Sequence, residues 1–95
     1  MVSFAYDGGP APADVRDARL IGLASSDVAE VQVLMSNGAR HKMPLRSAYI
    51  GDEEYRAFGH RINRAALRGG IGPTAVLALS KGGAEIDRQG TGFAG

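Results

Sequence analysis

One stretch of the sequence indicates the fold class: Val28-Ala-Glu-Val-Gln-Val-Leu-Met35, then Ser36-Asn37-Gly38, then Ala39-Arg-His-Lys-Met-Pro-Leu45. Apolar and polar side chains alternate on both flanks, and a turn-forming triplet separates them. Such a pattern is typical of a β-hairpin, because successive side chains of a strand point to opposite faces. The sequence therefore predicts two antiparallel strands joined by a short loop.

The side-chain pattern also predicts the length of the loop. A two-residue turn at Asn37-Gly38 sets Val33 opposite Lys42 and mixes apolar with charged side chains on each face. A three-residue loop, with Gly38 in the left-handed conformation as a G1 bulge, makes one face almost continuously apolar. We therefore expect the three-residue loop, which gives the pairs Met35–Ala39, Val33–His41 and Val31–Met43.

The opposite face of this hairpin is expected to be solvated. It brings Glu30 diagonally close to Lys42, and opposite charges at such positions attract each other. Pro44 follows in the second strand and has no N–H to donate to a ladder. We expect Pro44 to end the pairing or to lie at a sheet edge.

A second hairpin is predicted over residues 74–88, with its turn at Gly82-Gly83. Its first strand contains the continuous apolar run 75–79, which is typical of a central or doubly covered strand. The return strand alternates like an edge strand. Three shorter strands are expected at residues 4–6, 18–23 and 48–50.

Residues 52–68 show a pattern that favours a helix. Tyr55, Phe58 and Ile62 recur at helical spacing, behind an acidic first turn and before a basic last turn. Gly59 lies inside this segment and costs a helix about 1 kcal/mol relative to alanine. We nevertheless expect one short amphipathic helix there.

These elements together predict a mainly β fold. We expect a small antiparallel β-sandwich or half-open sheet of five to seven strands, with the helix near 52–68 packed on it. The 95 residues are expected to form a single domain, with flexible ends at about 7–13 and 89–95. The expected core consists of Leu20, Ile21, Val31, Val33, Met43, Leu45, Val76, Leu77, Leu79 and Ile86.

The order of turns and strands also suggests a family. Gly22-Leu23-Ala24 precedes Ser26-Asp27-Val28, Val31-x-Val33 runs into Asn37-Gly38, and the apolar run 75–79 leads to Gly82-Gly83. Over residues 18–88 this order resembles the small immunoglobulin-like β-sandwich modules of extracytoplasmic proteins in high-GC bacteria. The resemblance implies an immunoglobulin-like sandwich and a non-catalytic interaction or spacer role outside the membrane. Its partner is then another protein or the rest of a larger chain.

Composition limits the classes of function. The chain is 44% hydrophobic and carries a formal net charge of +1, which is ordinary for a globular protein. It has no cysteine, so neither disulfides nor thiolate metal sites stabilise it. No signal peptide or long apolar run is evident, so we expect no membrane insertion. The sequence itself leaves the compartment open, as well as whether the chain is part of a longer protein.

A set of basic residues supports an alternative function. On the predicted helix these residues form a stripe that could bind the phosphates of nucleic acid or another anion. The competing interpretation is a solvated helix face whose last arginines complement the helix dipole. The residues of the stripe are Arg56, His60, Arg61, Arg64 and Arg68.

The remaining polar features predict no catalytic site, metal site or cofactor. The acidic triplet 52–54 lacks the ligand spacing of a calcium loop. His41 and His60 have no cysteine or fixed partner spacing for zinc, and His41 falls on the predicted core face. The glycine-rich segment 69–73 follows a helix rather than a strand, which favours a C-cap over a phosphate loop. We therefore expect a non-enzymatic module that contacts its partner through an exposed strand edge or an outer sheet face.

Overall fold

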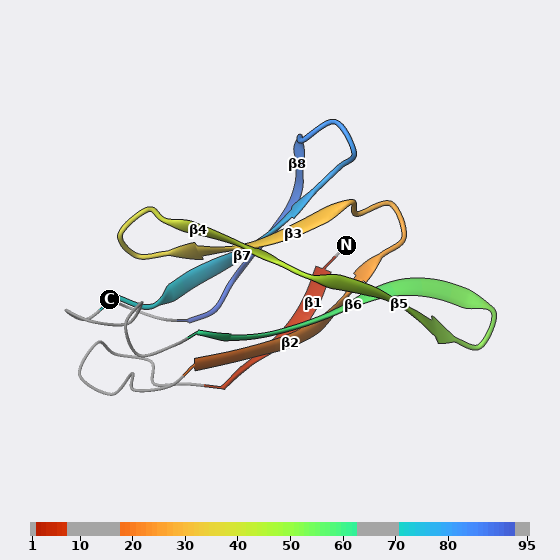
Figure 1. The fold of residues 1–95 in the computed structure, drawn as a ribbon, viewed down its shortest axis with the longest axis horizontal. Helices are drawn as coiled ribbons and strands as arrows, with labels where there is room; N and C mark the ends of the chain where they lie inside the picture. The colour runs from red at the N-terminus through yellow and green to blue at the C-terminus, as the bar shows by residue number, and fades with distance from the viewer. Residues whose placement is uncertain (1, 8–17, 63–70, 93–95) are drawn as a thin grey trace.

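The computed structural model describes residues 2–7, 18–62 and 71–92, and these form eight strands and no helix. The strands make two four-stranded antiparallel sheets, shown in Figure 1. The mainly β prediction is confirmed, with eight strands instead of five to seven. In order, sheet A contains β1 (Val2–Asp7), β2 (Ala18–Ser25), β6 (Glu53–Ile62) and β5 (Leu45–Ile50). Sheet B contains β4 (Arg40–Met43), β3 (Glu30–Met35), β7 (Pro73–Leu79) and β8 (Glu85–Gly90).

The β3–β4 hairpin has the predicted three-residue loop. Gly38 has a φ of 88°, and the Met35 amide donates to the Ala39 carbonyl over 2.8 Å. The pairs Val31–Met43 and Val33–His41 are those expected. On the opposite face Lys42 Nζ lies 3.3 Å from Glu30 Oε1. The period-two pattern was therefore sufficient to determine the register of this hairpin.

Pro44 separates β4 from β5, and the chain changes sheets there. Strand β4 pairs with β3 in sheet B, whereas β5 pairs with β6 in sheet A. Proline cannot donate to the β3 ladder, so the predicted end of pairing is confirmed. The β5–β6 hairpin then extends past the other strands at the right of Figure 1.

The helix predicted for residues 52–68 is wrong over 53–62, where β6 runs as an inner strand of sheet A. Phe58 and Ile62 are four residues apart, a spacing that fits one face of a helix and equally one face of a strand. Gly59 disfavours the helix, and pairing with β2 and β5 satisfies the backbone along both edges. Non-local pairing therefore overrides the local pattern. Residues 63–70 lie outside the described part of the chain.

The hydrophobic core lies between the two sheets. Side chains of Leu20, Phe58 and Ile62 from sheet A pack in one cluster with those of Val33 and Val76 from sheet B. Leu45 is partly buried against this cluster. The other predicted core residues that are buried are Val31, Met43, Leu77 and Leu79.

Two predicted core residues are exposed. Ile21 is 66% exposed and Ile86 is 44% exposed. Ile21 follows the fully buried Leu20 on β2, so strand alternation turns it to the outer face of sheet A. Apolar identity alone cannot distinguish such neighbours, whereas the period of a strand can.

The remaining expectations for strands are confirmed. The short strands expected at 4–6, 18–23 and 48–50 fall within β1, β2 and β5, and the second hairpin is β7–β8. The run 75–79 is buried throughout on the inner strand β7. Of the ends predicted to be flexible, Asp7 closes β1 and residues 89–90 close β8, while 8–13 and 93–95 lie outside the described residues.

Candidate functional site

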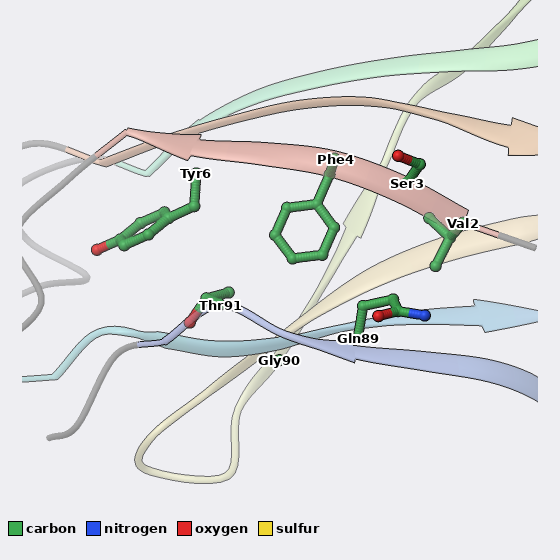
Figure 2. Close-up of a pocket in the computed structure, with 7 residues that line it drawn as sticks. All are labelled: Val2, Ser3, Phe4, Tyr6, Gln89, Gly90 and Thr91. Atoms are coloured by element: carbon green, nitrogen blue, oxygen red, sulfur yellow. The ribbon is translucent and has the colours of Figure 1, made fainter.

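A groove of about 500 Å³ lies where the edge strands β1 and β8 of the two sheets face each other. Figure 2 shows the rings of Phe4 and Tyr6 directed from β1 toward the segment that carries Gln89 and Thr91. Phe4 and Tyr6 are both half-buried. The groove therefore has aromatic surface on one wall and polar groups on the other. Its full lining is Val2, Ser3, Phe4, Tyr6, Gln89, Gly90 and Thr91.

Strand alternation positions the aromatic wall. Val2, Phe4 and Tyr6 occupy every second position of β1 and therefore share the face that turns toward sheet B. Phe4 lies opposite Gly22 of β2, and Gly22 lies opposite Phe58 of β6. A Cβ atom at Gly22 would lie 2.6 Å from Phe58 Cζ and 2.7 Å from Phe4 Cβ. The glycine thus leaves room for both rings.

A hydrogen bond joins the two sheets beside this groove. The backbone amide of Val2 in β1 donates to Asp87 Oδ2 of β8 over 2.8 Å. This bond lowers the pKa of Asp87 below its ordinary value of 3.8, and a second amide bond, from Arg88, acts in the same direction. Asp87 therefore holds β1 to sheet B most strongly when its carboxylate is charged.

We expect Asp87→Ala to lower the free energy of unfolding at neutral pH by about 1 kcal/mol, because it removes a charge-assisted hydrogen bond. A group with a lowered folded-state pKa stabilises the fold above its unfolded pKa, here 3.8, and loses that effect as the pH falls through the folded value. Urea unfolding should thus give the variant a lower free energy of unfolding than the parent at pH 7, and nearly equal values for the two below pH 3.8. An equal difference at both pH values would contradict this role.

His41 and His60 meet between the sheets. Their ring centroids are 6.3 Å apart and the rings are perpendicular, with His41 on β4 and His60 on β6. Burial lowers the pKa of His60 below 6.5, and the nearby His41 lowers it further. The prediction that His41 lies on the core-facing side is consistent with its partial burial. No group of three or more metal-ligating side chains occurs among the described residues.

The stability of the fold should depend on pH through this pair. Because the pKa of His60 is lowered on folding, the unfolded chain binds more protons than the folded chain just below pH 6.5. Stability should therefore fall as the pH is lowered from 6.5 through the folded-state pKa of His60. Thermal melts of parent and His60→Gln between pH 7 and pH 5 provide the test. If the melting temperature of the parent fell no more steeply with decreasing pH than that of the variant, this effect would be excluded.

The predicted basic stripe does not share one face in the described part of β6. Arg56 and His60 occupy the strand face that includes Phe58, whereas Arg61 occupies the opposite face, beside Arg19 of β2. Arg56 is half-buried and its Nε has no hydrogen-bond partner. Arg64 and Arg68 lie outside the described residues, so their part of the prediction stays untested.

Comparisons with models of protein families, with curated proteins and with solved structures found no match. No helix long and apolar enough to cross a membrane occurs in the described ranges.

Sequence reasoning missed the groove between β1 and β8. The alternation of Val2, Phe4 and Tyr6 is visible in the sequence and indicates that these side chains share a face. The position of β8 opposite them comes from the pairing of sheets through a core, which has no local signal. The expectation that an exposed strand edge or an outer sheet face contacts a partner named no strand, and it stays a prediction.

Proposed function

We propose that this chain is a non-enzymatic protein-interaction module that accepts an extended segment of a partner protein in the groove between β1 and β8. The proposal rests on one observation: two edge strands, β1 and β8, face each other across the groove that Phe4 and Tyr6 line. Each of these strands has one neighbour in its sheet, β2 for β1 and β7 for β8. Edge strands offer backbone N–H and C=O groups to an added strand.

The order of strands supports an immunoglobulin-like module. Immunoglobulin domains arrange strands A, B, E and D in one sheet and pair C, F and G, with C′ in some domains, in the other. The orders β1-β2-β6-β5 and β4-β3-β7-β8 correspond to A-B-E-D and C′-C-F-G when the strands are lettered along the chain. The chain has neither cysteine nor tryptophan, so the central disulfide and tryptophan of antibody domains have no counterpart.

The groove suits a peptide better than a small polar molecule. A bound strand takes affinity from main-chain hydrogen bonds and specificity from pockets for alternate side chains. Phe4 and Tyr6 are two residues apart on β1, so they match the side-chain repeat of an extended peptide. We therefore expect a partner segment with apolar residues at every second position.

Display of random nine-residue peptides against the purified chain tests the proposal. We expect enrichment of sequences that alternate apolar and polar residues. Binding of the enriched peptides should weaken at least about tenfold in Phe4→Ala, a loss of about 1.4 kcal/mol. Ile86→Ala provides a matched control, because this exposed apolar side chain lies on β8 outside the groove lining. The melting temperature of each variant reports whether the fold is retained.

Two results would contradict the proposal. One is the absence of any enriched peptide, and the other is a peptide that binds a folded Phe4→Ala variant as tightly as the parent. Enrichment of acidic peptides whose binding is lost at physiological salt would instead support the anion-binding alternative.

A further inference from the structure

We infer that the partner segment bound between β1 and β8 carries a lysine or arginine that pairs with the carboxylate of Asp87 at one end of the groove. This inference rests on the proposed function, since it concerns the chemistry of the same partner. The basic residue lies two positions from the nearest apolar residue of that segment. The backbone of β1 determines this spacing, and the surroundings of Asp87 determine the sign of the charge.

The even-numbered residues of β1 turn their backbone N–H and C=O groups toward the groove. The amide of Val2 donates to Asp87 Oδ2 over 2.8 Å, although Val2 lies opposite Ala24 in the pairing of β1 with β2. In an antiparallel pair, residues that face the partner strand with both backbone groups alternate with residues that face away. The backbone groups of Phe4 therefore face the groove as well. A strand added to this edge forms hydrogen bonds with Phe4.

Asp87 caps one backbone amide on each of the two edges. Its Oδ2 accepts from Val2 of β1, and its Oδ1 accepts from the amide of Arg88 on β8 over 2.9 Å. The Arg88 amide faces the edge because Thr91, three residues later, donates to the Thr74 carbonyl of β7 over 3.0 Å. A partner strand therefore finds the carboxylate of Asp87, and no free donor, at this end of the groove.

Strand geometry then places the basic residue of the partner. In an added strand, the residue opposite Phe4 and the residue opposite Val2 are two positions apart and point to the same face. The first contacts the ring of Phe4, which lines the groove. The second lies where Asp87 Oδ2 meets the Val2 amide. The expected partner thus has a lysine or arginine two residues from an apolar residue, in either chain direction.

The charge of Asp87 has no basic side chain beside it in the part of the chain that the structure describes. The guanidinium of the adjacent Arg88 turns instead to Glu85, with Nε 2.6 Å from Oε1. The groups that donate to Asp87 are the two amides and, at 3.4 Å, Gln89 Nε2, and all of them are neutral. Oδ2 accepts only the Val2 amide, so one of its lone pairs remains for a cationic donor.

Peptide display against the parent and Asp87→Asn tests the chemistry of the partner. Peptides enriched on the parent should carry lysine or arginine two residues from an apolar residue. Asp87→Asn should abolish this preference and keep the apolar alternation, because asparagine retains one oxygen to accept from the Val2 amide. Glu85→Gln is the matched control. It removes a negative charge from the same strand outside the groove lining, so the basic preference should persist.

The affinity of an enriched peptide measures the contact itself. Replacing its basic residue with glutamine should weaken binding to the parent about fivefold at low salt. Asp87→Asn should bind the two peptides with dissociation constants within about twofold of each other. The difference on the parent should shrink at high salt, which screens a partly exposed charge pair. Calorimetric titration measures these constants, and the melting temperature of each variant reports whether the fold is retained.

The outcomes separate this inference from the proposed function. Peptides whose binding depends on Phe4 but which show no basic preference would overturn the inference and leave the proposed function standing. An equal loss from the glutamine replacement on the parent and on Asp87→Asn would overturn it too. If no peptide is enriched, or if the enriched peptides bind a folded Phe4→Ala variant as tightly as the parent, the proposed function fails and the inference fails with it.

Discussion

Replacing Gly22 with valine should remove at least about 3 kcal/mol from the free energy of unfolding, because overpacking a filled interior costs about 1–3 kcal/mol and here the backbone of β1 and the Phe58 ring must both shift. The added Cβ would lie 2.6 Å from Phe58 Cζ, 2.7 Å from Phe4 Cβ and closer still to the backbone oxygen of Ser3, which cannot move without disturbing the pairing of β1 with β2. A domain of this size is stable by only about 5–15 kcal/mol. Thermal unfolding should therefore shift down by at least about 12 °C.

Gly59→Val is the matched control for this prediction. Both glycines lie inside paired strands of sheet A, and neither has a left-handed φ. Only Gly22 faces the core, so the two substitutions differ in what the new side chain meets. Gly59→Val should melt at or above the parent temperature, because the added side chain has room and valine favours strands. If both substitutions lowered the melting temperature equally, the assignment of faces in β2 and β6 would be wrong.

Aspartate at Leu20 should unfold the domain, whereas aspartate at the adjacent Ile21 should leave it folded. Leu20 is fully buried between the sheets, and an unpaired carboxylate there loses its hydration without gaining a partner. Ile21 is 66% exposed, so its replacement keeps the new charge in water. Urea unfolding followed by circular dichroism measures both variants.

The two variants should differ in their free energy of unfolding by most of the stability of the domain. Leu20→Asp should show no cooperative transition, because the cost of several kcal/mol approaches the total stability. Ile21→Asp should lose no more than about 1 kcal/mol, mainly through weaker strand propensity. If both variants unfolded cooperatively at the same urea concentration, Leu20 would not be a core residue.

The sequence predicted those parts of the fold in which local chemistry is unambiguous. Gly38 and the alternation around it specified the loop, the pairs and the exposed Glu30–Lys42 contact. Pro44 marked the end of a strand because it lacks a donor. In each case one residue type permits few backbone arrangements, so no knowledge of distant residues was needed.

The parts that failed depend on residues far apart in the chain. The spacing of Tyr55, Phe58 and Ile62 suits a helix, yet β2 and β5 provide partners that make this segment a strand. The strand also places Arg61 on the opposite face from Arg56 and His60. The groove at Phe4 and Tyr6 was missed for a similar reason, since its second wall lies more than eighty residues later in the chain.

We propose that the edges of β1 and β8 form the binding surface. Its most direct test is the ¹H–¹⁵N and aromatic ¹³C spectrum of the labelled chain, recorded alone and with a peptide enriched in the display experiment. Binding in the groove should shift the signals of Phe4, Tyr6, Gln89 and Thr91 and give intermolecular Overhauser contacts between the peptide and both rings. Shifts confined to the outer face of sheet A or to the β5–β6 hairpin, with Phe4 and Tyr6 unchanged, would contradict it.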